Sequence, residues 1–327
     1  MRFGSTVRPR FADRTGAWSS IWMVVLALVG CGGPDSLPGG DSLPGCPLGT
    51  AGDDCEPGSF DAVGVGWGGI CAVRSRSGDV VCEIFGVDEE EEVAGPAEPL
   101  ATLSLHAFSH GCGLQRDSGD LTCWPAPSTI ADEPLLPAPE LADLRQVVAG
   151  RYFSCALDAQ GAVSCWLTIE AGVGEQKVVE SAPSTRTRPE PFDFIAAGTG
   201  RACGIHQGTD VMECWPSDDA LPEGLAVRDV AVGNDTVCAV VASTGSVECW
   251  GRDAEGRQGD FTRVSTDGET HCAIRSDDGG LECWGVGADP HPDGAFADVR
   301  VGYGLACGLR PKGEVACWRT WTNEDAP

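Results

Sequence analysis

A pair of cysteines recurs seven times along this chain of 327 residues, with ten or eleven residues from the first cysteine to the second. Successive pairs begin 34 to 48 residues apart, and six of the seven second cysteines are followed directly by tryptophan. A unit that repeats at such a period predicts an array of small β-sheets. The pairs are Cys71/Cys82, Cys112/Cys123, Cys155/Cys165, Cys203/Cys214, Cys238/Cys249, Cys272/Cys283 and Cys307/Cys317, and the tryptophans are Trp124, Trp166, Trp215, Trp250, Trp284 and Trp318.

Each cysteine pair fits the two strands of a β-hairpin. In HCAIRSDDGGLECW, placing Cys272 opposite Cys283 leaves a four-residue turn at 276–279. In CALDAQGAVSC, a three-residue loop ending on Gly161 keeps the same register. Facing residues of a non-hydrogen-bonded antiparallel pair lie ~4.5 Å apart at Cα, a separation that a disulfide tolerates. The sequence therefore predicts one disulfide within each hairpin.

The tryptophan after each second cysteine points to the strand face opposite the disulfide. Because sulfur bridges and indole rings both avoid water, both faces of each hairpin are predicted to be buried by neighbours, with the six tryptophans packed between blades. No convincing amphipathic helical run occurs between residues 60 and 321. We predict an all-β fold, a seven-bladed β-propeller with one intra-blade hairpin disulfide per blade, because seven units lie within the propeller range of roughly four to eight. An open solenoid is the alternative.

Residues 1–30 resemble a secretory signal. A basic stretch precedes the apolar run IWMVVLALVG, which is too short to cross a ~30 Å hydrocarbon core as a helix. The segment Leu28-Val29-Gly30-Cys31 resembles a bacterial lipobox, so we predict cleavage before Cys31 and its lipidation; an ordinary signal peptide is the alternative. The predicted domains are a signal peptide at 1–30, a lipidated Gly/Pro/Ser-rich tether at 31–59, the propeller at 60–321 and a C-terminal tail at 322–327.

The cysteine count supports export to an oxidising compartment. The chain has 17 cysteines, and setting Cys31 aside leaves 16, an even number. Cys46 and Cys55 flank the turn CPLGTAGDDC and are predicted to form an eighth bridge. We predict a protein anchored by its lipid in the bacterial cell envelope, in the outer membrane, facing the periplasm or the cell surface.

The chain is strongly acidic. Its formal net charge is −27, and removal of the signal, with four arginines and Asp13, leaves −30. Such an excess opposes binding to nucleic acid, and to anionic membranes other than through the lipid. We therefore expect no nucleic-acid partner.

The repeated pattern is a Val-x-x-Gly strand, Cys-Ala-Leu, a turn and Val-x-Cys-Trp-Gly, as in VVAGRYFSCALDAQGAVSCW at 147–166, DVAVGNDTVCAVVASTGSVECWG at 229–251 and DVRVGYGLACGLRPKGEVACW at 298–318. It resembles the regulator of chromosome condensation repeat over roughly 260 residues, which implies a seven-bladed propeller. Glu83 replaces the first tryptophan, and only Trp250 and Trp284 precede glycine. The founder acts on a small GTPase and on chromatin, roles that do not fit this chain, so no functional residue is transferred.

No catalytic constellation emerges, and we expect no enzyme activity, metal or cofactor. His110 and His271 occupy the same repeat position beside hairpin cysteines, which favours packing over ligation. Zinc knuckles have only two to four residues between their cysteines, unlike these pairs. The acidic run 88–92 lacks the spacing of a calcium loop and is typical of a solvated loop. Glu213, Glu248 and Glu282 recur before cysteine, which favours a structural role in the blade.

The connections between cysteine pairs are unequal. They span 30, 32, 38, 24, 23 and 24 residues, so the first three carry insertions, at 84–104, 124–145 and 167–193. Variable loops on a rigid scaffold often carry recognition, so we predict that these insertions form one rim that contacts an envelope or extracellular protein; unselected insertions are the alternative. The predicted function is protein recognition or scaffolding. Inhibition of an extracellular enzyme, as by a secreted bacterial β-lactamase inhibitor with this fold, and a ligand or glycan site in the central channel remain open.

Overall fold

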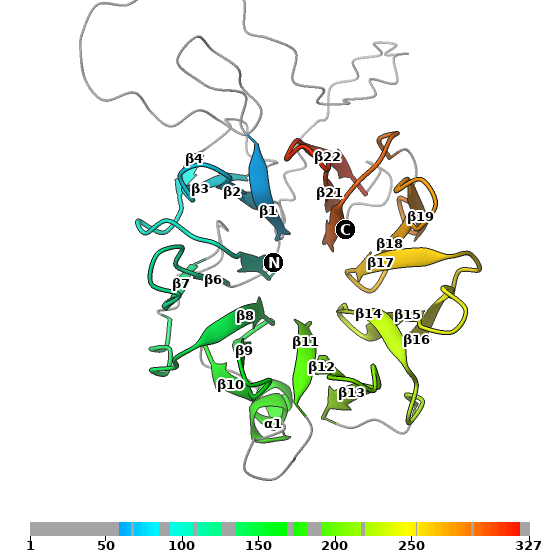
Figure 1. The fold of residues 1–327 in the computed structure, drawn as a ribbon, viewed down its shortest axis with the longest axis horizontal. Coiled ribbons are helices and arrows are strands. Elements are labelled where there is room, and N and C mark those ends of the chain that lie inside the picture. Colours follow the sequence, from blue (N-terminus) through cyan, green and yellow to red (C-terminus); the bar gives the residue numbers. More distant parts are fainter. Residues whose placement is uncertain are drawn as a thin grey trace, which may run out of the picture.

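The computed structural model describes residues 59–66, 69–84, 92–106, 110–125, 135–168, 173–181, 191–216, 220–252, 254–288 and 291–320. Within these residues the strands form seven antiparallel sheets, which stand around a central axis in the order of the chain (Figure 1). Each sheet is one blade, and its first strand lies nearest the axis. The predicted all-β, seven-bladed propeller is confirmed.

The described strands are assigned to the blades as follows. Blade 1 contains β1 (Phe60–Val65), β2 (Gly69–Arg74), β3 (Val80–Ile84) and β4 (Glu92–Ala94). Blade 2 contains β5 (Ser104–Leu105), β6 (His110–Leu114) and β7 (Leu121–Pro125), and blade 3 contains β8 (Leu144–Ala149), β9 (Phe153–Asp158) and β10 (Val163–Leu167). Blade 4 contains β11 (Phe192–Ala197), β12 (Ala202–His206) and β13 (Met212–Trp215), and blade 5 contains β14 (Val227–Val232), β15 (Thr236–Val241) and β16 (Val247–Gly251). Blade 6 contains β17 (Phe261–Thr266), β18 (Thr270–Arg275) and β19 (Leu281–Gly285), and blade 7 contains β20 (Asp298–Gly302), β21 (Leu305–Leu309) and β22 (Val315–Arg319).

The second and third strands of every blade form the predicted hairpin. In all seven, the two cysteines face each other in the register and are bonded, with Cα atoms 4.0 to 4.1 Å apart. The bridges are Cys71–Cys82, Cys112–Cys123, Cys155–Cys165, Cys203–Cys214, Cys238–Cys249, Cys272–Cys283 and Cys307–Cys317. Each hairpin turn also contains a glycine with φ between 71° and 84°, a conformation that side chains disfavour. The turn glycines are Gly78, Gly119, Gly161, Gly208, Gly245, Gly279 and Gly313.

The disulfides are buried less evenly than the sequence analysis predicted. The first cysteine of every pair is completely buried, whereas the second cysteine is only partly buried in four blades, at Cys123, Cys165, Cys249 and Cys317. All seven second cysteines lie on the third strand, farther from the axis, so their burial depends on what covers that strand in each blade. The second cysteines of the other three blades are buried, namely Cys82, Cys214 and Cys283.

Blade 1 shows what completes this burial. Its fourth strand, β4, pairs with β3 and sets Val93 opposite Cys82, which is 1% exposed. In this blade the second cysteine therefore lies inside the sheet rather than on its outer edge.

Hydrophobic clusters fill the spaces between blades. In five of them, the tryptophan of one blade packs in the same cluster as the disulfide cysteines of the preceding blade, as Trp318 does with Cys272 and Cys283. Trp124 packs on Val73 of blade 1. Burial of the indole rings is confirmed for five tryptophans, but Trp250 is only partly buried. Disulfide and indole therefore pack on each other across the blade interfaces.

The ring is closed by packing between blade 7 and blade 1. Phe60 and Val63 of β1 share a cluster with Leu305 and Leu309 of β21. The backbone N–H of Phe60 donates to the carbonyl of Gly313 at 2.8 Å, the same bond that ties other first strands to the preceding hairpin turn. These contacts exclude the open solenoid, because a solenoid leaves its first and last repeats apart.

The expectation that the propeller segment contains no helix is wrong at one place. Helix α1 (Val173–Ser181) lies within the insertion that follows β10 and covers the periphery of blade 3 (Figure 1). Val178 is fully buried in the cluster between blades 3 and 4. The helix is stabilised by this packing; its own amphipathic pattern is weak, which is why the sequence did not reveal it.

The described parts of the insertions also cover sheet edges. β4, in the first insertion, pairs with β3 at the outer edge of blade 1. In the second insertion, the backbone N–H of Leu136 donates to Thr168 at 2.6 Å, which holds residues 135–143 beside blade 3. An uncovered outer strand would expose unpaired backbone groups, so these segments protect the blades.

Candidate functional site

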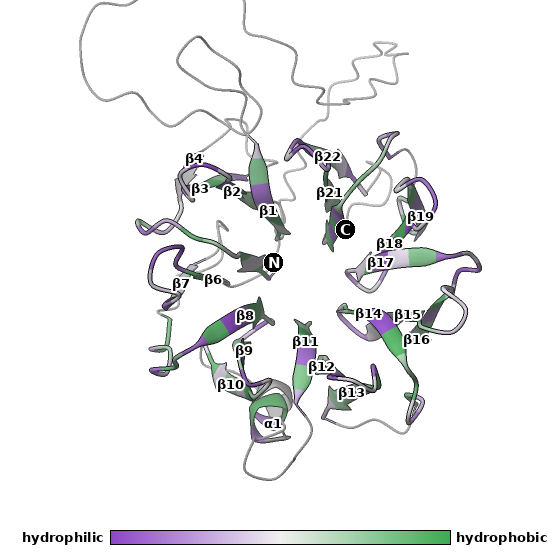
Figure 2. Cartoon of the chain, in the orientation of Figure 1, coloured by the Kyte–Doolittle hydropathy of each residue, from purple (hydrophilic) through white to green (hydrophobic). Residues whose placement is uncertain are grey.

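The first strands of all seven blades surround a central channel with a cavity of about 420 Å³. One wall is largely apolar and includes Leu103, Val148 and Phe194 from blades 2, 3 and 4. Figure 2 shows that the innermost strands β8 and β14 also contain hydrophilic segments between hydrophobic ones. The channel is therefore a polar site with one apolar side, rather than a filled core.

The exposed inner edges of the sheets are tied together by side chains. In four pairs of neighbouring blades, a side chain from the first strand of one blade accepts a hydrogen bond from a backbone N–H of the next first strand. Unpaired strand edges are costly, and these bonds satisfy them. The pairs are Ser104 with Ala149 at 2.9 Å, Gln146 with Ile195 at 3.0 Å, Asp229 with Val264 at 2.9 Å and Ser265 with Val301 at 2.9 Å.

Blades 5, 6 and 7 place six charged residues in the cavity lining. Asp267 and Glu269 lie in the loop between β17 and β18, and the other four lie on first strands. Asp229 on β14 lies 3.7 Å from the Arg263 guanidinium on β17. On β20, Arg300 donates from Nε and pairs through Nη2 with Oδ2 of Asp298, at 3.1 and 2.9 Å. Asp229 is buried, whereas about half of each arginine side chain faces water in the channel. The cluster of four first-strand residues carries no net charge at neutral pH, but its guanidinium groups face the cavity.

The environment of Asp229 is electrostatically unfavourable for a carboxylate. Burial raises the pKa of Asp229 from 3.8 to about 6, against the opposing effects of the Val264 N–H, Arg263 and Arg300. The pKa of Arg300 is raised, first by Asp298 and then by Asp229. Asp229 thus changes charge near pH 6, while the arginines keep theirs.

We expect the variant Asp229→Asn to reveal this cost. The pKa of Asp229 is about 6 in the folded protein and 3.8 in the unfolded chain. Between these pH values the carboxyl group is protonated in the folded protein and ionised in the unfolded chain. The free energy of unfolding therefore falls as pH rises through this range. The shift corresponds to about 3 kcal/mol. Urea unfolding of both proteins at pH 4 and pH 7.5 measures it. From pH 4 to pH 7.5, the free energy of unfolding of the native protein should fall by about that much relative to that of the variant. If the difference in unfolding free energy between the two proteins is the same at both pH values, the raised pKa of Asp229 is contradicted.

The loops that join first to second strands lie at one end of the channel, and we call this the channel-mouth face. A series of backbone hydrogen bonds connects its loops from blade to blade. Arg151 donates to Gly198, Thr199 to Gly233 and Asn234 to Asp267, at 2.8 to 3.3 Å. These bonds span blades 3 to 6, so the loops have little freedom to rearrange.

The channel-mouth face is unevenly charged. Arg151 and Arg201 lie on blades 3 and 4, whereas Asp235, Asp267 and Glu269 lie on blades 5 and 6. Burial raises the pKa of Asp267 to about 6, although its Oδ1 accepts two backbone N–H bonds. The two tyrosines of the chain, Tyr152 and Tyr303, also lie in these loops, with the Arg151 guanidinium 5.0 Å from the Tyr152 ring.

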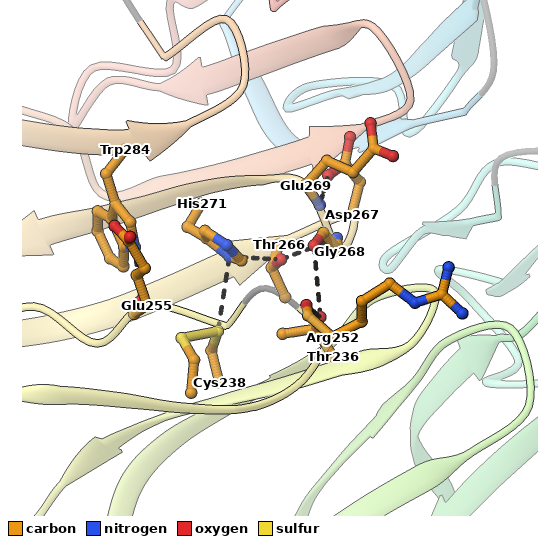
Figure 3. The surroundings of a disulfide bond; sticks show 11 residues. Thr236, Cys238, Arg252, Glu255, Thr266, Asp267, Gly268, Glu269, His271 and Trp284 are labelled. Carbon is orange, nitrogen blue, oxygen red and sulfur yellow. Dashed lines mark hydrogen bonds between the residues drawn. A yellow bond between two sulfur atoms is a disulfide. The ribbon is translucent and has the colours of Figure 1, made fainter.

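His271 lies between a tryptophan and a disulfide (Figure 3). Its ring stacks on Trp284 at 5.5 Å, and its Nδ1 lies 2.8 Å from the Thr266 hydroxyl and 3.6 Å from Cys238 Sγ. Burial lowers the pKa of His271 to about 4, so it is neutral. Cys238, Cys249 and His271 have three potential metal-ligating atoms close together, but the two sulfurs are already bonded to each other.

His110 is also buried, between blades 2 and 3, but the strand register places it one residue farther from its hairpin cysteine than His271. Its Nε2 lies 2.7 Å from Ser154 Oγ and 3.1 Å from Thr168 Oγ1, and all three residues are completely buried. Burial lowers the pKa of His110 to about 4. A serine beside a histidine is a nucleophile only where substrate can reach it, so this trio is a tie between two blades. Both histidines pack in the core, as their repeat position indicated.

The hairpin cysteines, which the sequence analysis singled out, are placed away from the channel. The cavity wall contains none of the cysteines of the seven described hairpins. Each second cysteine lies on the third strand of its blade, two strands away from the axis; these are Cys82, Cys123, Cys165, Cys214, Cys249, Cys283 and Cys317. The disulfides therefore stabilise the blades and take no direct part in the channel site.

Several predicted sites lie outside the described residues, namely the lipidated Cys31, the Cys46/Cys55 bridge and residues 88–91 of the acidic run. The last residue of that run, Glu92, begins β4 and pairs with Glu83. Two of the recurring glutamates have partners within or beside their blades: Glu213 Oε2 is hydrogen-bonded to His206 Nε2 at 2.9 Å, and Glu282 forms an ion pair with Arg257 at 2.6 Å. Among the described helices, none has the length and apolar character needed to cross a membrane. The sequence analysis did not identify the channel residues Asp229, Arg263, Asp298 and Arg300.

The fold resembles several solved propellers. The CRINKLY WD40 ectodomain of the Arabidopsis thaliana receptor kinase ACR4 is 20% identical, with a TM-score of 0.61 over 81% of this chain and 98% of that chain. The ectodomain of the Physcomitrella patens receptor kinase CR4 is 23% identical, with a TM-score of 0.60 over 81% and 75%. Yeast RCC1 (Prp20), in its complex with Kap60, is 14% identical, with a TM-score of 0.51 over 81% of each chain.

These similarities establish the β-propeller fold, and they include a protein that contains the repeat that the sequence pattern resembles. No protein-family profile matches the chain, and a sequence comparison with curated proteins found no match.

Proposed function

We propose that this chain is an exported lipoprotein whose propeller recognises another protein of the cell envelope or the extracellular space, through the channel-mouth face. The observation that carries the proposal is the set of backbone hydrogen bonds that connects the loops of blades 3 to 6. Preformed loops lose little conformational entropy on binding, which favours affinity. Seven disulfides hold the blades beneath them.

The similar structures support a recognition role. Yeast RCC1 is seen bound to Kap60, and two other similar propellers are ectodomains of receptor kinases. We propose that this chain is a cysteine-rich bacterial member of the same repeat family. The signal, the lipobox ending at Cys31 and the even number of remaining cysteines support export and anchoring by lipid.

The charges of the channel-mouth face indicate the kind of partner surface. Arg151 and Arg201 would face acidic groups, and Glu269 would face basic ones, whereas Asp235 already pairs with Arg252 at 3.9 Å. Tyr152, beside Arg151, is of a residue type enriched at interface hot spots. Complementary charge fixes the orientation of a partner more than it adds affinity.

Photo-crosslinking in intact cells tests this proposal. A photoreactive residue is placed at Arg201 or Glu269 on the channel-mouth face, and in matched controls at Asp117 or Asp277, which are exposed in hairpin turns at the other end of the channel. We expect one specific protein adduct from both channel-mouth positions and none from the controls. Adducts from both ends, or from neither, would contradict the proposal.

Shortening the insertions distinguishes binding by the channel-mouth face from binding by the insertions. Only residues 126–134 and 182–190 are removed, because α1 contributes Val178 to the core. Persistence of the adduct after trimming assigns recognition to the channel-mouth face, and its loss assigns recognition to the insertions, as the sequence analysis predicted. The identity of the captured protein then decides whether the propeller inhibits an extracellular enzyme.

A further inference from the structure

The channel contains positively charged groups whose hydrogen-bonding capacity is mostly unused. A guanidinium has five N–H donors. Within the described residues, Arg263 makes only the 3.7 Å ion pair with Asp229, which is longer than a hydrogen bond. Arg300 uses Nε and Nη2 on one oxygen of Asp298. About half of each side chain is exposed although both line the cavity, so the remaining donors are accessible to a molecule that enters the channel.

Both arginines act on the same part of the channel. Arg263 on β17 lies 3.7 Å from Asp229, and Arg300 lies on β20, which packs beside β17, so both guanidinium groups lie on the same side of the cavity. Guanidinium groups recognise carboxylates with two parallel hydrogen bonds, and they do so more strongly where water is limited. The position of these arginines thus suits a ligand carboxylate that reaches the wall of blades 6 and 7.

The rest of the cavity favours an apolar extension of that ligand. Leu103, Val148 and Phe194 line the wall of blades 2 to 4. The volume of about 420 Å³ lies in the range, roughly 300 to 1,000 Å³, of small-molecule sites. Phosphate or sulfate would satisfy the arginines but would leave the apolar wall uncovered.

We propose that the central channel binds a carboxylate with an apolar chain, its carboxylate on Arg263 and Arg300 and its chain against Leu103, Val148 and Phe194. The ligand is either a small organic acid or the C-terminal carboxylate of a polypeptide, because the two share this chemistry. The proposal is independent of the recognition function of the channel-mouth face.

Asp229 gives the site a pH dependence. It competes with the ligand for Arg263 and Arg300, and Asp298 on β20 is the other acidic group of the cluster. Asp61, Asp267 and Glu269 also line the cavity, and Asp267, with a pKa of about 6, loses its charge over the same pH range. Below about pH 6, Asp229 is neutral and the four-residue cluster has a net charge of +1, while a carboxylate ligand is still ionised. Binding should therefore tighten as pH falls from 7.5 to 5.5.

Titration of the mature, disulfide-bonded protein with octanoate, followed by NMR or calorimetry, tests the site. We expect a dissociation constant on the order of 1 mM at pH 7.5, given the small number of ligand atoms, and about tenfold tighter binding at pH 5.5. Octan-1-ol and octylammonium should bind at least about tenfold more weakly than octanoate. A tri-leucine peptide, compared with its C-terminal amide, tests whether the ligand is a polypeptide C-terminus or a small organic acid. Tighter binding of the peptide with a free carboxylate than of octanoate assigns the ligand to polypeptides, and weaker binding assigns it to organic acids.

Variants locate the binding site. Arg263→Ala and Arg300→Lys should each weaken octanoate binding about tenfold, the lysine variant guarding against misfolding because it keeps a charge beside Asp298. Asp229→Asn should bind octanoate at pH 7.5 more tightly than the native protein does at the same pH, and its affinity should depend less on pH. Arg228→Ala is the matched control, because Arg228 pairs with Asp260 away from the cavity and should not affect binding. The proposal is overturned if Arg263→Ala binds octanoate as tightly as the native protein does, or if octylammonium binds as tightly as octanoate. It is also overturned if no binding is detected at about 10 mM octanoate.

Discussion

Removal of one hairpin disulfide, by the double substitution Cys272→Ala/Cys283→Ala, should lower the free energy of unfolding by about 3 kcal/mol or more. The bridge closes a loop of 11 residues, for which chain entropy alone gives about 2.7 kcal/mol. Both sulfurs are also buried in the cluster with Trp318, so their removal leaves a cavity that adds to the loss. Equilibrium urea unfolding measures the difference.

The pair Cys307/Cys317 provides a matched control for the packing contribution. It closes a loop of nearly the same length, with a separation of 10 residues, but it packs on blade 1, where Glu83 replaces the tryptophan, and Cys317 is only partly buried. Its removal should therefore cost less than that of Cys272/Cys283. Equal losses would show that contact between disulfide and indole contributes nothing beyond chain entropy.

Trp284→Ala should destabilise the propeller by about 3 to 5 kcal/mol, the range for truncating a large buried aromatic side chain. The indole is 5% exposed, packs in the cluster of Cys238 and donates from Nε1 to the carbonyl of Glu255 at 2.8 Å. Truncation therefore removes apolar contacts and leaves a carbonyl acceptor without its donor. Thermal and urea unfolding of the two proteins measure the change.

Trp250→Ala is the internal comparison, since Trp250 occupies the same repeat position but is only partly buried between blades 4 and 5. We expect less than half of the loss seen for Trp284→Ala. If the two variants lose the same free energy, burial of the indole between blades does not determine how much each blade interface contributes.

The architecture could be predicted because the cysteines impose a strong local constraint. Two bonded cysteines at a separation of 10 or 11 permit few arrangements other than a hairpin, and seven such hairpins with tryptophan on the opposite face require neighbours on both sides. The extent of burial was not predictable in the same way, because Cys123 and Cys165 are partly exposed whereas Cys214 and Cys283, on the same outer strand of their blades, are buried. Helix α1 could not be predicted because its packing depends on few apolar side chains; among those described, Val178 is buried in the cluster and Val179 packs against it.

The channel site was missed for a different reason. Asp229, Arg263 and Asp298 occupy equivalent positions of successive first strands, directly after a bulge that shifts the pairing in β14 and β17. A bulge changes which residues face the axis, so simple alternation along the strand does not reveal them. Alignment of DVAVG, RVSTD and DVRVG on the hairpin cysteines would have placed the three charges side by side.

Mass spectrometry of the mature protein, digested without reduction after purification from membranes, tests the central claim most directly: that this is an exported, lipid-anchored ring of seven separately bridged blades. We predict that each of the seven bridges joins the two cysteines of one hairpin, and that the N-terminal peptide begins at Cys31 and carries a diacylglycerol mass. Bridges between different blades, free hairpin thiols, or an unmodified N-terminus at another residue would contradict it.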